Sequence, residues 1–296
     1  MTASDATLRE LRESDAEEVA ALFHTVYGDE RPIDAEEIVS WANNSEVKTE
    51  WMRVLELDGR VVGYGDIMIE DDEVALDAAA PGGHWDTFFE WAEEQARAEG
   101  RPRVRLFLPA GHHTEDLAGD RGYRLWRSSY TMNIVLGDEP PDKPPPPNGI
   151  TLRPFCPEDE DRLRVAVNEA FANDPFFHEE TPERFREFNL RARGFDPALW
   201  LLAWDGQELA GFVLAFPERA GEPDLGWIGT LGVREPWRRR GLGDALLRSS
   251  IGKLHARGLR RVGLGVDAEN ETGALALYER AGMEVVRQGN NWVLDL

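Results

Sequence analysis

Residues 231–247 read LGVREPWRRRGLGDALL and join an apolar, strand-like run to a helical pattern. Arg238, Gly241 and Gly243 stand in the turn between the two. Glycines let a backbone approach an anion closely, and the unpaired N–H groups and positive dipole end of the new helix point at that anion. The stretch predicts a site for a phosphate-bearing ligand, although a glycine-rich turn before a helix also occurs without any ligand.

A second segment follows the helix. Val262–Val266 alternates as a strand, and residues 267–283 then read DAENETGALALYERAGM, with Asn270 and Tyr278 in a four-residue repeat. Together the two segments resemble the GNAT superfamily of N-acetyltransferases, in detail over about residues 150–296 and more weakly over the first half. The resemblance is carried by Val233, Pro236, Arg238, Arg239, Gly241, Leu242, Gly243, Leu264, Val266, Asn270, Ala274, Leu277, Tyr278, Gly282 and Met283.

The resemblance implies direct transfer of an acetyl group from acetyl-coenzyme A to an amine. The residues it implies for cofactor binding are Leu231, Gly232, Val233, Arg238, Arg239, Arg240, Gly241, Leu242, Gly243 and Asn270. The backbone N–H groups of residues 239–243 would hold the pyrophosphate, with charge added by Arg238 to Arg240. Residues 231–233 would bond the pantetheine arm and polarise the thioester carbonyl. Tyr278 would protonate the departing thiolate, although a helical tyrosine on an apolar face can also be core.

The attacking amine must lose a proton, and the sequence offers Asp224, before the strand, as the best candidate base. Glu222 and Glu169 are alternatives, and a solvated carboxylate at a strand end is the plain structural reading. Trp227 and Thr230 occupy the strand where many relatives of the family carry the base.

The chain reads as two domains. Residues 137–149, GDEPPDKPPPPNG, suit a semi-rigid polyproline spacer, so we predict domains at 1–137 and 150–296 joined by a linker at 138–149. Thr7-Leu8-Arg9 and Thr151-Leu152-Arg153 each precede a similar helical pattern, which indicates that the two domains repeat one fold. The expected class is α/β, with two tandem GNAT domains, each a mixed, mostly antiparallel sheet flanked by helices. The tandem plan also resembles that of the mycothiol synthase family, two-lobed acetyltransferases of a cysteinyl amino sugar.

The first domain departs from the family motifs at the positions that would carry the chemistry, so we interpret it as a degenerate, structural domain. Alignment places Ala80 opposite Arg238, Gly83 opposite Gly241, Trp85 opposite Gly243 and Ala118 opposite Tyr278. Trp85 is expected to fill the space that the pyrophosphate needs. The alternative is that Pro81-Gly82-Gly83 still forms an anion-binding turn.

Composition limits the partners. The net charge of −23 divides into −18 for residues 1–149 and −5 for residues 150–296, which argues against nucleic acid and acidic membranes as partners. The N-terminus has no signal-peptide pattern, and no apolar run is long enough to span a membrane, so a cytoplasmic monomer or homodimer is expected. The single Cys156 excludes an internal disulfide and is expected to be packed. The paired histidines His112-His113 and the segment His178–Glu180 lack helical metal-ligand spacing, so no metal is expected.

Three functions stay open. The favoured one is an N-acetyltransferase of a small-molecule primary amine, active in the second domain. The alternatives are a non-catalytic acyl-coenzyme A binding or sensing module, and an enzyme acting on a peptide or protein amine. Four aromatic residues either line the acceptor pocket or belong to the core: Phe176, Phe177, Phe185 and Phe188.

Overall fold

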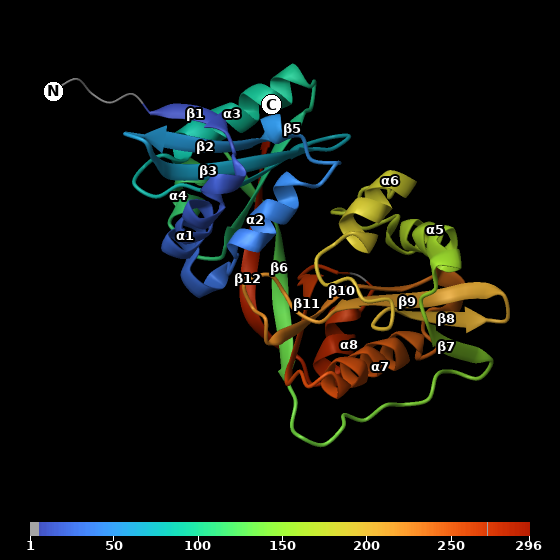
Figure 1. Cartoon of the computed structure of the whole chain (residues 1–296). Coiled ribbons are helices and arrows are strands. Elements are labelled where there is room, and N and C mark those ends of the chain that lie inside the picture. Colours follow the sequence, from blue (N-terminus) through green and yellow to red (C-terminus); the bar gives the residue numbers. More distant parts are fainter. Residues whose placement is uncertain (1–5, 271) are drawn as a thin grey trace. The chain divides into compact units, whose positions relative to one another are not determined.

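The computed structural model describes residues 6–270 and 272–296, which fall into two compact units (Figure 1). Unit 1 contains the chain up to Ser129, together with Asp267–Glu269 and Arg287–Leu296; unit 2 contains Tyr130–Val266 and Asn270–Val286. These units differ from the predicted domains, because the end of the chain belongs to the first unit. Residues 138–149 contain no helix or strand, as expected of a proline-rich spacer. No described helix is both long and apolar enough to cross a membrane.

Unit 1 is a mixed sheet with helices on both faces. Its elements are β1 (Thr7–Glu10), η1 (Glu13–Asp15), α1 (Ala16–Tyr27), η2 (Gly28–Glu30), α2 (Ala35–Ala42), η3 (Thr49–Trp51), β2 (Met52–Leu57), β3 (Arg60–Ile69), β4 (Val74–Ala79), α3 (Trp85–Ala98), β5 (Arg103–Pro109) and α4 (Thr114–Asp120). Strands β1 to β4 are antiparallel, and β4 runs parallel to β5. Strand β5 then pairs with the end of β12 (Glu284–Asp295), from Gly289 opposite Pro109 to Asp295 opposite Arg103.

Unit 2 repeats this order of elements. Its elements are β7 (Ile150–Pro154), η4 (Pro157–Asp159), α5 (Glu160–Phe171), α6 (Pro182–Phe185), η5 (Arg186–Leu190), β8 (Leu201–Asp205), β9 (Glu208–Phe216), β10 (Leu225–Val233), η6 (Glu235–Trp237), α7 (Leu242–Ala256), β11 (Arg261–Asp267) and α8 (Ala274–Arg280). Helices α5 and α6 lie over one face of the sheet, and α7 and α8 lie over the other (Figure 1). Each pair of helices covers a separate apolar cluster. In both units mixed, mostly antiparallel strands are flanked by helices, which confirms the predicted fold class.

Both units begin with the same ion pair, which explains the repeated Thr-Leu-Arg motif. Asp15 accepts hydrogen bonds from Arg9 Nη1 and Nη2 at 2.7 and 3.0 Å and from the backbone N–H of Arg12 at 2.8 Å. Asp159 accepts from the Arg153 guanidinium at 2.6 and 2.7 Å and from the backbone N–H of Cys156 at 2.9 Å. The hydrogen bond from Arg153 lowers the pKa of Asp159. Each pair thus ties a first strand to the helix that follows it.

Cys156 is exposed, contrary to the expectation that it is packed. The preceding residue, Phe155, takes the buried position, at 5 % exposure. Cys156 instead lies at the start of η4, where its backbone N–H donates to Asp159, so its side chain points away from the core.

An unusual carboxyl pair lies inside unit 1, on the face of the sheet covered by α1. Asp66 on β3 stands directly opposite Asp77 on β4. Asp77 accepts two hydrogen bonds from Arg31, at 2.5 and 2.6 Å, whereas Oδ2 of Asp66 is buried with no hydrogen-bond partner in the described chain. Burial and then repulsion by Asp77 raise the pKa of Asp66 to about 8.

This pair makes stability depend on pH. Aspartate in an unfolded chain has a pKa of about 3.9, so between about pH 4 and 8 the folded state binds a proton that the unfolded state has lost. The free energy of unfolding should therefore fall as pH rises through this window, and Asp66→Asn should remove that decline. Thermal unfolding at pH 5 and pH 8 checks this, with the exposed Asp72→Asn as control. Parallel pH profiles for wild type and Asp66→Asn would contradict it.

Candidate active site

The turn before α7 has the backbone of an anion site. It runs from the end of β10 at Val233 to Leu242, and it holds Arg239 and Gly241 in left-handed conformations, with φ of 60° and 83°. The first helical hydrogen bond joins Ala245 N to Gly241 O at 3.1 Å, so the N–H groups of residues 241–244 have no partner within the helix. A Cβ added to Gly241 would meet nothing within 4 Å, so a ligand can approach these groups. The fifteen-residue α7 adds its positive dipole end.

The missing side chain of Gly243 serves packing. A Cβ at Gly243 would lie 3.3 Å from the Leu277 side chain and 3.9 Å from that of Val233, so the glycine lets α7 lie close to α8 and β10. The aligned residue in unit 1, Trp85, also points inward. It is 2 % exposed, with its ring centroid 5.7 Å from that of Phe89. The expectation that Trp85 fills a pyrophosphate space was wrong, because its side chain lies in the core.

The three arginines of the turn have different surroundings. Arg238 Nε donates to Val233 O at 2.9 Å and Nη2 donates to Ala170 O at 3.0 Å, so its guanidinium ties the end of β10 to the end of α5. Arg239 and Arg240 are exposed, and Arg239 Nη1 lies 3.6 Å from the Cβ position of Gly273, just before α8. The charges that remain accessible to an anion are therefore those of Arg239 and Arg240.

Strand β10 separates from β11 before it reaches the turn. The two strands pair in parallel only from Leu225 to Ile228, and the pairing of β10 with β9 shifts register between Ile228 and Thr230. The described residues of β11 therefore offer no partner to the half strand that contains Leu231, Gly232 and Val233. Its backbone groups on that side can bond an amide-bearing ligand.

Tyr278 lies in α8 with its side chain almost fully buried, at 7 % exposure. Burial is the only influence on its pKa, which it raises to about 12. The hydroxyl therefore keeps its proton at physiological pH. The neighbouring Leu277 packs on Gly243, so α8 adjoins the first turn of α7. Tyr278 and the turn thus belong to the same unit, and the helix of Tyr278 adjoins the helix that follows the turn.

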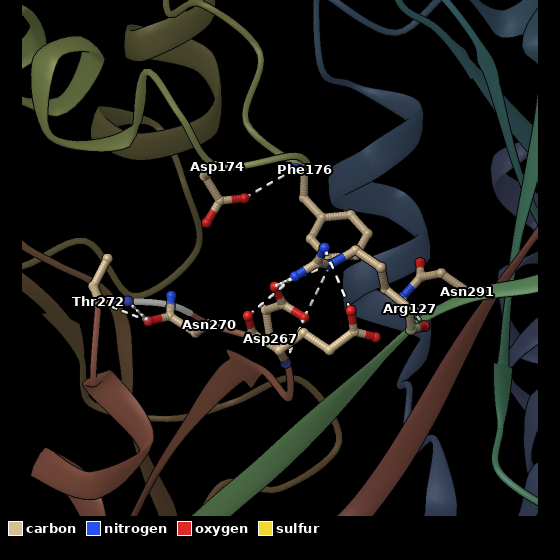
Figure 2. Close-up of polar contacts among 8 residues, drawn as sticks. Arg127, Asp174, Phe176, Asp267, Asn270, Thr272 and Asn291 are labelled. Atoms are coloured by element: carbon tan, nitrogen blue, oxygen red, sulfur yellow. Dashed lines mark hydrogen bonds and ion pairs between the residues drawn. The ribbon is translucent and has the colours of Figure 1, made fainter.

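Asn270 shapes the loop between β11 and α8. Its Oδ1 accepts hydrogen bonds from the Thr272 backbone N–H at 2.9 Å and from the Thr272 hydroxyl (Figure 2). This Asx turn occupies the carbonyl oxygen, whereas the amide Nδ2 has donors to offer a ligand.

The structure does not bring Asp224 to these residues. Asp224 is exposed and lies directly before β10, whereas the turn follows the other end of this nine-residue strand. Of the alternatives, Glu222 forms ion pairs with Arg219 and Arg261 at 3.3 and 3.5 Å. Glu169 pairs with Arg234 at 2.5 Å. None of the three carboxylates stands out as a base.

The remaining candidates divide between core and surface. Phe185 is fully buried and Phe177 stacks on Phe171, so these two belong to the core; Phe176 and Phe188 are partly exposed. His112 Nε2 lies 3.1 Å from Val26 O. Among the described residues no group of three or more His, Cys, Asp or Glu side chains is arranged to hold a metal ion.

Comparison with known proteins gives consistent results. The profile described as "Acetyltransferase (GNAT) family" matches residues 165–283. A mycothiol acetyltransferase of Cellulomonas flavigena is 30% identical over 294 residues, covering 90% of this chain and 82% of that protein. A mycothiol acetyltransferase of Streptomyces scabiei is 36% identical over 189 residues, covering 62% of this chain and 59% of that protein.

Among solved structures, a GCN5-related N-acetyltransferase from Sphaerobacter thermophilus superposes with a TM-score of 0.79 at 33% identity, covering 98% of this chain and 95% of that one. The curated relatives are not all matched over their whole length. The chain spans 59%, 54% and 53% of three mycothiol acetyltransferases, that of Streptomyces scabiei among them.

Proposed function

Because the chain belongs to the acetyltransferase (GNAT) family, we propose that it transfers an acetyl group from acetyl-coenzyme A to a primary amine of a small molecule. The observation that carries the proposal is the pairing, in unit 2, of an open anion-binding turn with a buried tyrosine that keeps its proton. The names of the mycothiol acetyltransferases that resemble the chain support a small-molecule acceptor.

The residues of unit 2 fit acetyl-coenzyme A, which would supply an activated acetyl thioester. The N–H groups of residues 241–244 and the side chains of Arg239 and Arg240 would hold its pyrophosphate. Backbone groups of residues 231–233 would bond its amide-bearing arm, and Asn270 Nδ2 would donate to it. Arg238 contributes by fixing the turn, since its guanidinium already bonds two backbone carbonyls.

Tyr278 would supply the proton that the leaving thiolate needs. A hydroxyl with a pKa of about 12 is protonated at neutral pH, and it can donate as negative charge develops on sulfur. The apolar surroundings of Tyr278 exclude water, which strengthens such a hydrogen bond.

We place the reaction in unit 2 alone. In unit 1 the connection from β4 to α3, residues 80–84, is shorter than residues 234–241 and contains no arginine. The position aligned with Tyr278 is Ala118. The aligned positions of unit 1 thus hold neither the arginines nor the tyrosine, although Gly83, with a φ of 88°, keeps the left-handed turn.

Asp224 is the weakest of the proposed site residues, and its role can be tested directly. Asp224→Asn is expected to change turnover by about twofold or less, because its exposed carboxylate lies at the far end of β10; removal of a true general base costs about a hundredfold. Turnover measured between pH 6 and 9 checks this. If Asp224→Asn instead lost most of its turnover at low pH and regained it at higher pH, Asp224 would be supported as the base.

A panel of amines, followed by the release of free coenzyme A thiol, tests the function itself. It should contain small primary amines, the acceptor of the mycothiol acetyltransferases, and a lysine-bearing peptide. Release with a small amine supports the proposal, and release with the peptide alone indicates a protein acceptor. Tight binding of acetyl-coenzyme A without release for any amine would indicate a non-catalytic binding module.

A further inference from the structure

A bidentate ion pair holds the end of β11. Arg127, on β6 (Arg124–Val135), donates from Nε to Asp267 Oδ1 and Oδ2 at 3.3 and 3.1 Å and from Nη2 to Oδ2 at 2.6 Å (Figure 2). The side chains of Arg127 and Asp267 are 20% and 6% exposed. Asp267 is therefore a nearly buried carboxylate that is paired with this arginine.

The same part of β6 holds the next two residues as well. Arg127 Nη2 also donates to Glu269 O at 3.3 Å, and Nη1 lies 3.6 Å from Glu269 Oε2. Ala268 N donates to Ser128 O at 2.9 Å. Asp267–Glu269 consequently belongs to unit 1, although the residues on either side of it, Val266 and Asn270, belong to unit 2.

The segment that follows carries the proposed chemistry. Asn270 comes directly after Glu269 and forms its Asx turn with Thr272. Gly273, with a φ of 81°, then forms the N-cap of α8, which contains Tyr278. A shift of residues 267–269 would therefore pass through only a few bonds before it reaches Asn270 and the start of α8.

We propose that Arg127 is a positioning residue for acetyl transfer, which fixes Asp267–Glu269 and so sets the places of Asn270 and Tyr278. The inference rests on the function proposed for unit 2. Under this proposal unit 1 takes part in acetyl transfer, because its Arg127 positions the loop that precedes Tyr278.

Unit 1 offers a matched control for a purely structural role. Arg105 Nε donates to Glu73 Oε1 at 2.5 Å, and these side chains are 18% and 6% exposed, almost the same as those of the Arg127 pair. Arg105 lies on β5, and its Nη1 donates to Asn291 Oδ1 at 3.3 Å. Loss of either arginine leaves a nearly buried carboxylate unpaired, so both losses should destabilise the fold.

The experiment compares Arg127→Gln and Arg105→Gln in the full chain. Both variants should have lower melting temperatures than wild type. Only Arg127→Gln should weaken acetyl-coenzyme A binding and lower kcat, each by about tenfold or more, because small misplacements of binding groups are costly. If Arg127→Gln does not fold, Arg127→Lys takes its place, since lysine keeps the charge but loses the two-pronged pairing. Equal effects of the two arginines on binding and kcat would overturn the proposal.

Hydrogen exchange separates this inference from the proposed function. Arg127→Gln should speed exchange of the amides of residues 268–270, 272 and 273, and Arg105→Gln should leave them unchanged. If the wild type acetylates no amine but the loop still loosens only in Arg127→Gln, the proposed function fails while the positioning of the loop is supported. Unchanged exchange in Arg127→Gln would refute the positioning role, whatever the enzyme acetylates.

Discussion

Replacing Tyr278 by phenylalanine is expected to lower turnover by roughly ten- to a thousandfold and to leave acetyl-coenzyme A affinity within about twofold. The hydroxyl donates its proton only as the thiolate departs, so its removal should affect the transition state and spare the bound ground state. The phenyl ring keeps the packing of Tyr278 in the core of unit 2. Thiol release gives kcat, and calorimetry gives the affinity.

The control for this substitution is Tyr123→Phe. Tyr123 is 3% exposed, and burial raises its pKa, yet it lies in the core of unit 1. Its loss of a hydroxyl should leave turnover unchanged. Near wild-type turnover in Tyr278→Phe would remove the tyrosine from the mechanism. Because the pKa of Tyr278 is about 12, its ionisation should cause no loss of rate below about pH 11.

Features set by local chemistry could be predicted from the sequence. The leucine spacing after Gly241 predicts a helix, and α7 spans Leu242–Ala256. Val262–Val266 was predicted as a strand, and β11 spans Arg261–Asp267. The backbone also agrees with the alignment of the two halves, because Gly83 and Gly241, placed opposite each other, have φ of 88° and 83°. The periodicity of helices and strands and the position of glycine turns depend on residues that are near in the chain, so a single sequence is enough to predict them.

Features set by tertiary packing could not be predicted in this way. The motif places Arg238 beside the phosphate, but its guanidinium bonds the carbonyls of Val233 and Ala170 instead. The alignment placed Trp85 opposite Gly243, but it did not show that both positions face inward. The Arg127 to Asp267 pair spans 140 residues and has no motif that would reveal it. The direction of a side chain depends on elements that are distant in sequence.

The course of β12 shows the same limit and changes how unit 1 must be tested. Residues 289–295 pair with β5, and Trp292 and Leu294 pack against the core of unit 1. The proline-rich segment is a visible boundary in the sequence, but nothing near it indicates that the last strand belongs to the first unit. A fragment of residues 1–140 would lack this strand, so ligand binding by unit 1 has to be measured in the full chain.

The full chain is expected to bind one acetyl-coenzyme A, and Gly241→Val should weaken that binding by about five- to thirtyfold. Left-handed backbone costs a non-glycine residue about 1–2 kcal/mol, and about 1.4 kcal/mol corresponds to tenfold in affinity. A valine should therefore move the N–H groups of the turn away from the phosphates. Gly241→Asn should bind nearly as wild type does, because asparagine tolerates this conformation.

Gly83→Val is the matched control for the stoichiometry, since Gly83 holds the aligned position in unit 1 with a φ of 88°. Calorimetric titration should give one site for wild type and for Gly83→Val, with unchanged affinity, because residues 80–84 offer a left-handed turn but no arginine to hold a pyrophosphate. Two sites in the wild type, one of which is lost in Gly83→Val, would show that unit 1 also binds the cofactor. If the chain binds one acetyl-coenzyme A, and Gly83→Val abolishes this binding while Gly241→Val leaves it unchanged, the cofactor site lies in unit 1.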